Sequence, residues 1–179
     1  MPGLPPLVRR AVALAEGLGF DRSCSVETGR LLHTLAAQRG RARVGEIGTG
    51  CGVGAAWIVS ALPPAARFVT VEVDERLAAA ATHLFADDEH VGVLCGDWEH
   101  TLPPHAPFEL LFVDARPAKA HAAVPGLLAP GGTAVLDDLR PGERMSYGVR
   151  ELWLEHPDLV AVELTVRPEE SVILAVRAL

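Results

Sequence analysis

The stretch VGEIGTGCGVG, residues 44–54, decides the fold of this chain. Its first residues, from Val44 to Gly48, predict a buried strand, and a helix is expected to begin at about Val53. Four glycines would let the backbone turn tightly and approach a ligand where a Cβ atom would collide: Gly48, Gly50, Gly52 and Gly54. Free N–H groups at the start of the helix would point at that ligand. Glycines alone are a weak signal, but a strand before them and a helix after them are typical of a nucleotide-binding turn.

Length and composition predict one globular domain that covers residues 1–179. Of the 179 residues, 49% are hydrophobic, which is enough to bury a substantial core. A net charge of −7 and a pI near 5.5 argue against a nucleic-acid partner or an anionic membrane, so the expected ligand is a small molecule. The three cysteines form no CxxC pair, which predicts reduced thiols and a cytoplasmic location. Neither a signal peptide nor an apolar run long enough to span a membrane is expected.

Strand-like and helix-like segments alternate along the chain. The expected strands are residues 44–48, 67–73, 90–94, 108–114, 133–138, 159–166 and 171–177, and the expected helices are residues 7–18, 25–38, 54–62, 74–86, 119–128 and 143–156. This alternation predicts an α/β fold, a doubly wound and mostly parallel seven-stranded sheet with helices on both faces. The short connection 167–170 permits only an antiparallel hairpin at the C-terminus. The helices in residues 1–40 would cover either an edge of the sheet or the ligand pocket.

Acidic side chains gather where the predicted strands end. They are Glu46 before the glycines, Glu72, Asp97, Asp114, and the pair Asp137 and Asp138. In an open parallel sheet, ligands bind beyond the carboxyl ends of the strands, so these acids should share one edge with the glycine turn. Glu72 lies 24 residues after Gly48, about the offset at which a carboxylate meets a ribose. Asp97 and Trp98 would bound an adenine, or form no more than a structural turn.

The combination of motifs resembles a known enzyme family. The motifs are E-x-G-x-G-x-G at residues 46–52, Glu72, Gly96-Asp97, FVDA at residues 112–115 and LAPGGTAVLDDL at residues 128–139. Together they look like the class I S-adenosylmethionine-dependent methyltransferases, and are most similar to the cation-dependent O-methyltransferases of the catechol and caffeoyl-CoA types. The resemblance covers nearly the whole chain, including the terminal hairpin and a helix near Ser25 to Leu31 with the family's S-x-x-x-G-x-x-L start. It implies a Rossmann-like methyltransferase fold.

The resemblance also implies which residues hold S-adenosylmethionine (SAM). Glu46, Gly48, Gly50 and Gly52 would cradle the methionine portion and the ribose side of the cofactor. Glu72 would hold the ribose hydroxyls, and Asp97 with Trp98 would lie at the adenine. Asp114 is expected both at the cofactor and in the chemistry.

Three aspartates match the family positions that hold a divalent cation, usually Mg²⁺: Asp114, Asp137 and Asp138. A hard cation prefers oxygen ligands and keeps open positions for water or substrate. A catechol that chelates such a cation would lose a proton more easily and become an oxyanion beside the electrophilic methyl group.

Two departures from the family pattern concern the chemistry. Family members usually have Asn where this chain has Asp138, and the family's catalytic lysine falls at Pro117, which cannot take a proton. Lys119, the only lysine in the chain, is the predicted replacement and acts with Asp114. Arg116 and His121 are further candidates, and a helix that begins at Pro117 would turn any of the three away from the site.

The predicted function is therefore SAM-dependent O-methylation, assisted by a divalent cation, of a hydroxyl group on a small phenolic or catechol-like acceptor. A homodimer partner would complete a small substrate lid. Two alternatives are an NAD-dependent oxidoreductase, which shares the glycine turn and the acid after the second strand, and a SAM-binding protein without catalytic turnover.

Overall fold

The computed structural model describes residues 3–140 and 147–179, with only the backbone of Tyr147. Its strands are β1 (Arg43–Ile47), β2 (Arg67–Glu72), β3 (Val91–Cys95), β4 (Phe108–Val113), β5 (Leu128–Leu139), β6 (Leu159–Arg167) and β7 (Glu170–Arg177). Its helices are α1 (Pro6–Leu18), α2 (Val26–Ala36), α3 (Val53–Val59), α4 (Glu75–Leu84), α5 (Trp98–Thr101), α6 (Arg116–Lys119) and α7 (Tyr147–Leu154), with 3₁₀ turns η1 (Pro103–His105) and η2 (Val124–Leu127).

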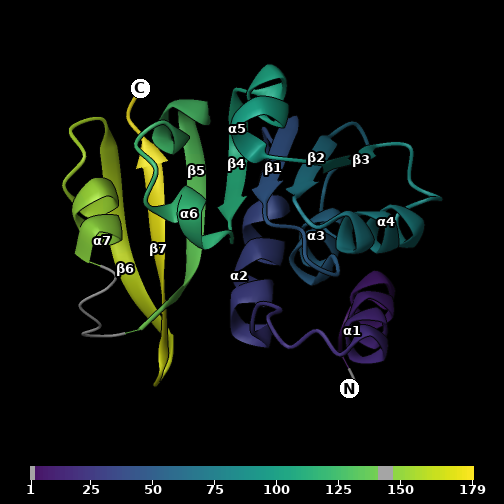
Figure 1. Cartoon of the computed structure of the whole chain (residues 1–179). Coiled ribbons are helices and arrows are strands. Elements are labelled where there is room, and N and C mark those ends of the chain that lie inside the picture. Colours follow the sequence, from purple (N-terminus) through teal and green to yellow (C-terminus); the bar gives the residue numbers. More distant parts are fainter. Residues whose placement is uncertain (1–2, 141–146) are drawn as a thin grey trace.

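The strands form the predicted mixed sheet in the order β3-β2-β1-β4-β5-β7-β6 (Figure 1). Strands β1 to β5 are parallel, whereas β7 is antiparallel to both β5 and β6. The α/β fold with its antiparallel C-terminal hairpin is thereby confirmed. The strand order reverses between β1 and β4, and the carboxyl ends of these two strands open the crevice in which doubly wound sheets bind ligands.

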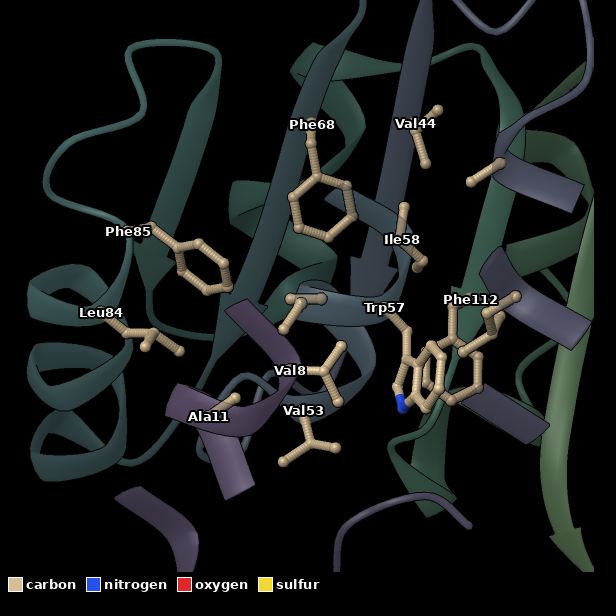
Figure 2. Close-up of a cluster of buried hydrophobic side chains, with 14 of the residues drawn as sticks. Val8, Ala11, Val44, Val53, Trp57, Ile58, Phe68, Leu84, Phe85 and Phe112 are labelled. Atoms are coloured by element: carbon tan, nitrogen blue, oxygen red, sulfur yellow. The ribbon is translucent and has the colours of Figure 1, made fainter. Parts of the chain in front are cut away.

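Alternating side chains of the strands face two separate hydrophobic cores. On β4, Leu110 and Phe112 join the core formed with α1, α2, α3 and α4, while Leu111 and Val113 join the core formed with α6, η2 and α7. Figure 2 shows the first core, in which Trp57, Phe112, Phe68 and Ile58 are all buried. Because every second strand residue is committed to one core or the other, polar groups collect at the strand ends.

The N-terminal helices pack on α3, in accordance with the two predicted N-terminal helices. The hydroxyl of Ser25 caps α2 by accepting a hydrogen bond from the backbone N–H of Thr28 at 3.2 Å. A Cβ atom at Gly29 would lie 2.1 Å from Nε1 of Trp57, so glycine at this position allows α2 to approach α3 closely.

The expected helix over residues 119–128 is wrong. Helix α6 ends at Lys119, and the next helical segment is the 3₁₀ turn η2. Pro125 has no N–H and its ring would clash with the preceding turn, so an α-helix cannot continue through it. The carbonyl oxygen of Lys119 instead accepts a hydrogen bond from Nε1 of Trp153 at 2.8 Å.

Helix α7 forms part of the expected helix 143–156, of which residues 143–146 lie outside the described residues. Within the parts of the chain described here, no helix is both long and apolar enough to cross a membrane.

Candidate active site

The glycine turn follows β1 and has the left-handed backbone that only glycine adopts easily. The φ angles are 98° at Gly48, 52° at Gly50 and 81° at Gly52. A Cβ atom at Gly48 would lie 2.9 Å from the backbone nitrogen of Ala115, just beyond β4. The turn therefore runs directly against the end of β4, and Asp114 and Ala115 both donate backbone hydrogen bonds to the carbonyl of Ile47 at 2.9 Å.

Glu46 lies beneath this turn. Its side chain is almost fully buried and accepts a 2.6 Å hydrogen bond from Oγ1 of Thr70, which is itself 2.6 Å from Oγ1 of Thr49. Gly54, the second residue of α3, leaves room for this carboxyl group. A Cβ atom at Gly54 would lie 2.6 Å from Oε1 of Glu46. Burial raises the pKa of Glu46 to about 8, so the carboxyl group retains a proton at neutral pH.

Glu72 stands at the end of β2 and binds the turn directly. Its Oε2 accepts from the backbone N–H of Gly50 at 2.8 Å, and its Oε1 accepts from that of Asp74 at 3.0 Å. These two bonds fix the carboxylate beside the glycine turn, and its remaining lone pairs can receive hydroxyl groups of a ligand.

Asp97 and Trp98 follow β3. One oxygen of Asp97 caps α5 by accepting from the backbone N–H of Glu99 at 3.0 Å, so the residue has the structural role of a helix cap. The indole of Trp98 meets the ring of His121 edge to face, with 5.1 Å between the ring centres. Their predicted role at an adenine stays a prediction.

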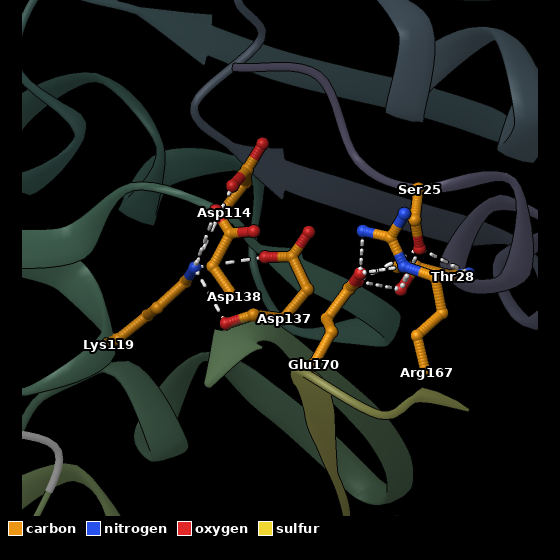
Figure 3. Close-up of polar contacts among 8 residues, drawn as sticks. All are labelled: Ser25, Thr28, Asp114, Lys119, Asp137, Asp138, Arg167 and Glu170. Atoms are coloured by element: carbon orange, nitrogen blue, oxygen red, sulfur yellow. Dashed lines mark hydrogen bonds and ion pairs between the residues drawn. The ribbon is translucent and has the colours of Figure 1, made fainter. Parts of the chain in front are cut away.

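Three aspartates meet at the ends of β4 and β5 (Figure 3). Asp114, Asp137 and Asp138 each offer one carboxylate oxygen, and these atoms lie within 4.8 Å of one another. The side chain of Asp137 is fully buried, that of Asp114 is 21% exposed and that of Asp138 is 65% exposed. We refer to these three residues as the acidic cluster.

Lys119 reaches into the acidic cluster. Its Nζ lies 2.9 Å from Oδ1 of Asp137, 3.7 Å from Oδ1 of Asp114 and 4.0 Å from Oδ2 of Asp138, and it also donates to the backbone carbonyl of Asp137 at 2.9 Å. Lys119 is the last residue of α6, and this position aims its side chain inward rather than away. The other two candidates lie elsewhere, because Arg116 is exposed and His121 contacts Trp98 and Glu99.

Burial and mutual repulsion set the charge of the acidic cluster. Burial raises the pKa of Asp114 well above its usual range, and the neighbouring Asp137 carboxylate adds to this rise. Burial opposes the charge of Lys119, but the carboxylates of Asp137 and Asp114 outweigh it and raise the pKa of the amine, which stays protonated. Oδ2 of Asp137 is buried and has no hydrogen-bond partner among the described residues, so one acceptor position of the cluster is available there.

The N-terminal segment covers the other side of the turn. A Cβ atom at Gly50 would lie 2.9 Å from Cζ of Phe20, which places this aromatic ring on the glycines. Beside it is a mostly apolar cavity of about 220 Å³, lined by residues that include Val8, Phe20, Cys24, Val26 and Trp57. The pKa of the Cys24 thiol, which lines this cavity, is raised by burial and then by the charges of Asp137 and Asp114. A smaller hollow of about 80 Å³ lies among Pro63, Pro64 and His90, at the opposite ends of the strands.

Sequence reasoning did not single out Phe20 and Cys24, nor Glu170 at the hairpin. Glu170 accepts hydrogen bonds from Oγ of Ser25 at 2.9 Å, Oγ1 of Thr28 at 2.8 Å and Nε of Arg167 at 2.7 Å (Figure 3). The C-terminal hairpin is thereby fastened to the start of α2. The contacts of Glu170 with Ser25 and Thr28 join segments that are distant in sequence, and no local pattern marks them.

Comparison with known proteins identifies the family to which the chain belongs. The methyltransferase domain family matches residues 46–139, which is more than half of the chain and runs from Glu46 to the end of β5. The chain belongs to this methyltransferase domain family. Among curated proteins, it is 37% identical over 79 residues to the transmembrane O-methyltransferase homolog of Rattus norvegicus, a match that covers 42% of this chain and 31% of that protein. The chain thus spans only about a third of that relative's length.

Solved structures match over nearly the whole domain. The O-methyltransferase TomG from Streptomyces achromogenes, which is involved in tomaymycin synthesis and was solved with SAM, is 27% identical with a TM-score of 0.82; the match covers 98% of this chain and 91% of that one. An O-methyltransferase from Bacillus cereus, solved with SAH, has a TM-score of 0.83 at 22% identity and covers 99% and 93%. The second match supports the fold alone.

The residues of this methyltransferase domain fit SAM better than they fit a divalent cation. The left-handed glycine turn packs against the end of β4, and the Glu72 carboxylate beside it suits ribose hydroxyls. At the acidic cluster, the buried Oδ2 of Asp137 favours a cation, but the Lys119 ammonium already lies within 4.0 Å of an oxygen of each of the three aspartates.

Proposed function

We propose that this protein transfers a methyl group from SAM to a hydroxyl oxygen of a small phenolic or catechol-like acceptor. The observation that carries the proposal is the contact between the two parts of the site. Gly48 lies against Ala115, so the glycine turn and the acidic cluster, which begins at Asp114, are neighbours across the switch point of the sheet. The bound cofactor supplies an electrophilic methyl group. Residues of the chain must bind the cofactor, align the acceptor and accept its proton.

The glycine turn and Glu72 would hold the cofactor. The turn would line the methionine portion and the Glu72 carboxylate would receive the ribose hydroxyls, while Glu46 holds the turn from beneath through Thr70 and Thr49. Much of the rate would come from alignment, because a methyl transfer needs the acceptor oxygen, the carbon and the sulfur in one line.

Asp114 and Lys119 would act on the acceptor hydroxyl. A partly exposed carboxylate with a raised pKa is suited to accept the hydroxyl proton, and Asp114 has both properties. The Lys119 ammonium, 3.7 Å from Asp114, would then stabilise the oxyanion that forms. The apolar cavity beside Cys24 suits the ring of a phenol, whereas a sugar or a charged acceptor would leave its polar groups unpaired there.

Magnesium assistance, which the resemblance implies, stays a prediction. It would require Asp114, Asp137 and Asp138 to coordinate a cation beside the Lys119 ammonium. A homodimer stays a prediction as well. The nicotinamide alternative loses its support because the family match includes the whole glycine turn and the acids at the ends of β4 and β5.

Titration of the purified protein with SAM and with SAH tests the proposal. We expect both SAM and SAH to bind. We expect NADH not to bind, so that adding the protein does not change NADH fluorescence. A panel of phenols and catechols with labelled SAM then tests transfer to oxygen. Absence of binding by both SAM and SAH would refute the proposal, and binding without transfer to any acceptor would favour a SAM-binding protein without turnover.

A further inference from the structure

We infer that the Lys119 ammonium is the resident cation of the acidic cluster, and that it excludes a divalent metal ion from Asp114, Asp137 and Asp138. The resemblance to cation-dependent enzymes predicts a metal at these carboxylates. The side chain found among them is the single lysine of the chain. Its consequence for catalysis, methyl transfer without a metal, rests on the proposed function, whereas the exclusion of the metal does not.

The first argument is hydrogen bonding. An ammonium group has three N–H donors, and two of them are used by Oδ1 and the backbone carbonyl of Asp137, each at 2.9 Å. The third can point toward Asp114 and Asp138, whose nearest oxygens lie 3.7 Å and 4.0 Å from Nζ. One ammonium thus reaches all three carboxylates that a metal would use.

The second argument is that Lys119 cannot readily withdraw. Its side chain is only 6% exposed, and its backbone is fixed by the hydrogen bond from Trp153 to its carbonyl. An ammonium that left Asp137 would stay buried without an equivalent partner, which is costly.

The third argument is repulsion between two cations. A Mg²⁺ ion sits about 2.1 Å from each ligand oxygen, so an ion on Oδ1 of Asp114 would lie at most about 6 Å from Nζ of Lys119. At that distance the ammonium repels a divalent ion and weakens the attraction that the three carboxylates exert on it. This holds even for an ion that used the open Oδ2 of Asp137 as a second ligand.

The choice of lysine agrees with this role. Lysine and arginine together number 16, and Lys119 is the one lysine among them. An ammonium is a compact point charge with three rotatable donors, whereas a guanidinium is a planar fork that suits paired oxygens. The compact group suits a position among three converging carboxylates.

Binding of Mn²⁺, followed through the EPR signal of the free ion, tests the inference on the full chain. We expect the wild type to bind no Mn²⁺ at this cluster up to millimolar concentration. Lys119→Met removes the ammonium at nearly constant length, and we expect it to bind one Mn²⁺ at least about 100-fold more tightly, with a rise in its melting temperature when Mn²⁺ is added. Asp137→Asn in the Lys119→Met background should abolish that site. Wild-type protein that binds one Mn²⁺ as tightly as Lys119→Met would overturn the inference.

The single lysine supplies a second measurement that needs no variant. With ¹⁵N-lysine labelling, the only side-chain ammonium signal belongs to Lys119. We expect equimolar Mn²⁺ to leave this signal sharp; paramagnetic broadening at that concentration would contradict exclusion, even if Lys119→Met did not fold.

Methyl transfer separates the inference from the proposed function. A protein that transfers methyl groups at an unchanged rate in EDTA supports both. A protein that excludes Mn²⁺ but neither binds SAM nor methylates any acceptor loses the proposed function and keeps the inference, while activity lost in EDTA and restored by Mg²⁺ would overturn the inference alone.

Discussion

The glycine turn and the acidic cluster are neighbours in space, but they are built in different ways. The turn is built mainly from the backbone of glycines with left-handed φ angles. One side chain, the carboxylate of Glu72, accepts a hydrogen bond from the backbone N–H of Gly50. The acidic cluster consists of side chains from β4, β5 and α6 that meet only in the folded chain. The difference teaches that a backbone site depends on the space around a few atoms, whereas a side-chain site depends on how charges balance.

The largest effect is expected from a methyl group in the turn. Gly48→Ala would place Cβ 2.9 Å from the backbone of Ala115 in a left-handed conformation, so the turn must move. We expect a loss of about 3 kcal/mol in the free energy of unfolding and at least a 100-fold loss in SAM affinity, measured by denaturation and by titration calorimetry.

Gly126→Ala is the matched control, because a Cβ atom there meets no atom of the described residues within 4 Å. Its effect on stability should stay within about 0.5 kcal/mol, and SAM affinity should not change. Equal effects of the two substitutions would show that the turn does not depend on the space at Gly48.

The next largest effect concerns charge balance in the acidic cluster. Asp137→Asn removes the carboxylate that holds the buried Lys119 ammonium at 2.9 Å, and we expect a loss of about 3 kcal/mol on urea unfolding at pH 7. Asp138 is 65% exposed and lies 4.0 Å from Nζ, so Asp138→Asn should change stability by less than about 0.5 kcal/mol. Its φ of 54° also suits asparagine.

This pair of variants tests whether Lys119 is held by the buried carboxylate of Asp137 or whether the three aspartates are independent surface acids. If both substitutions had the same small effect, Lys119 would not depend on Asp137, and the contrast between the two parts of the site would fail.

The backbone-built part was the part that the sequence made predictable. Strands with nearly continuous apolar residues, the spacing of Gly48, Gly50 and Gly52, and the offset of Glu72 are local patterns, and the structure has the predicted sheet and turn. The short hairpin connection likewise predicted the antiparallel ends of β6 and β7. These features follow from backbone sterics and from periodicity, which are properties of short segments.

The side-chain-built part was predictable only as a set of residues. The three aspartates and Lys119 were named, but their arrangement depends on where α6 ends, and there the Lys119 carbonyl bonds to Trp153 and Pro125 prevents an α-helix through the following segment. The expected helix over 119–128 missed both constraints. Phe20, Cys24 and Glu170 were not foreseen because each acts across the fold on a distant segment.

The smallest of the expected effects tests whether an ionisable group beneath the glycine turn contributes to its stability. That group is Glu46. Burial raises the pKa of its carboxyl to about 8 in the folded protein, above the ordinary value of 4.5. The folded state therefore binds a proton that the unfolded state has released, and the stability from this proton is lost as the pH rises from about 4.5 through 8. Glu46→Gln cannot ionise and should lack this loss, although it gives up part of the hydrogen bonding with Thr70.

We expect the free energy of unfolding of Glu46→Gln, relative to wild type, to improve by about 2 kcal/mol between pH 6 and pH 8. Urea denaturation across that range measures it, with the exposed Glu151→Gln as the control that should leave the pH dependence unchanged. Parallel pH profiles for wild type and Glu46→Gln would mean that Glu46 is already ionised in the folded protein. The turn would then contain a buried charge, and its stability would depend on charge balance as the acidic cluster does.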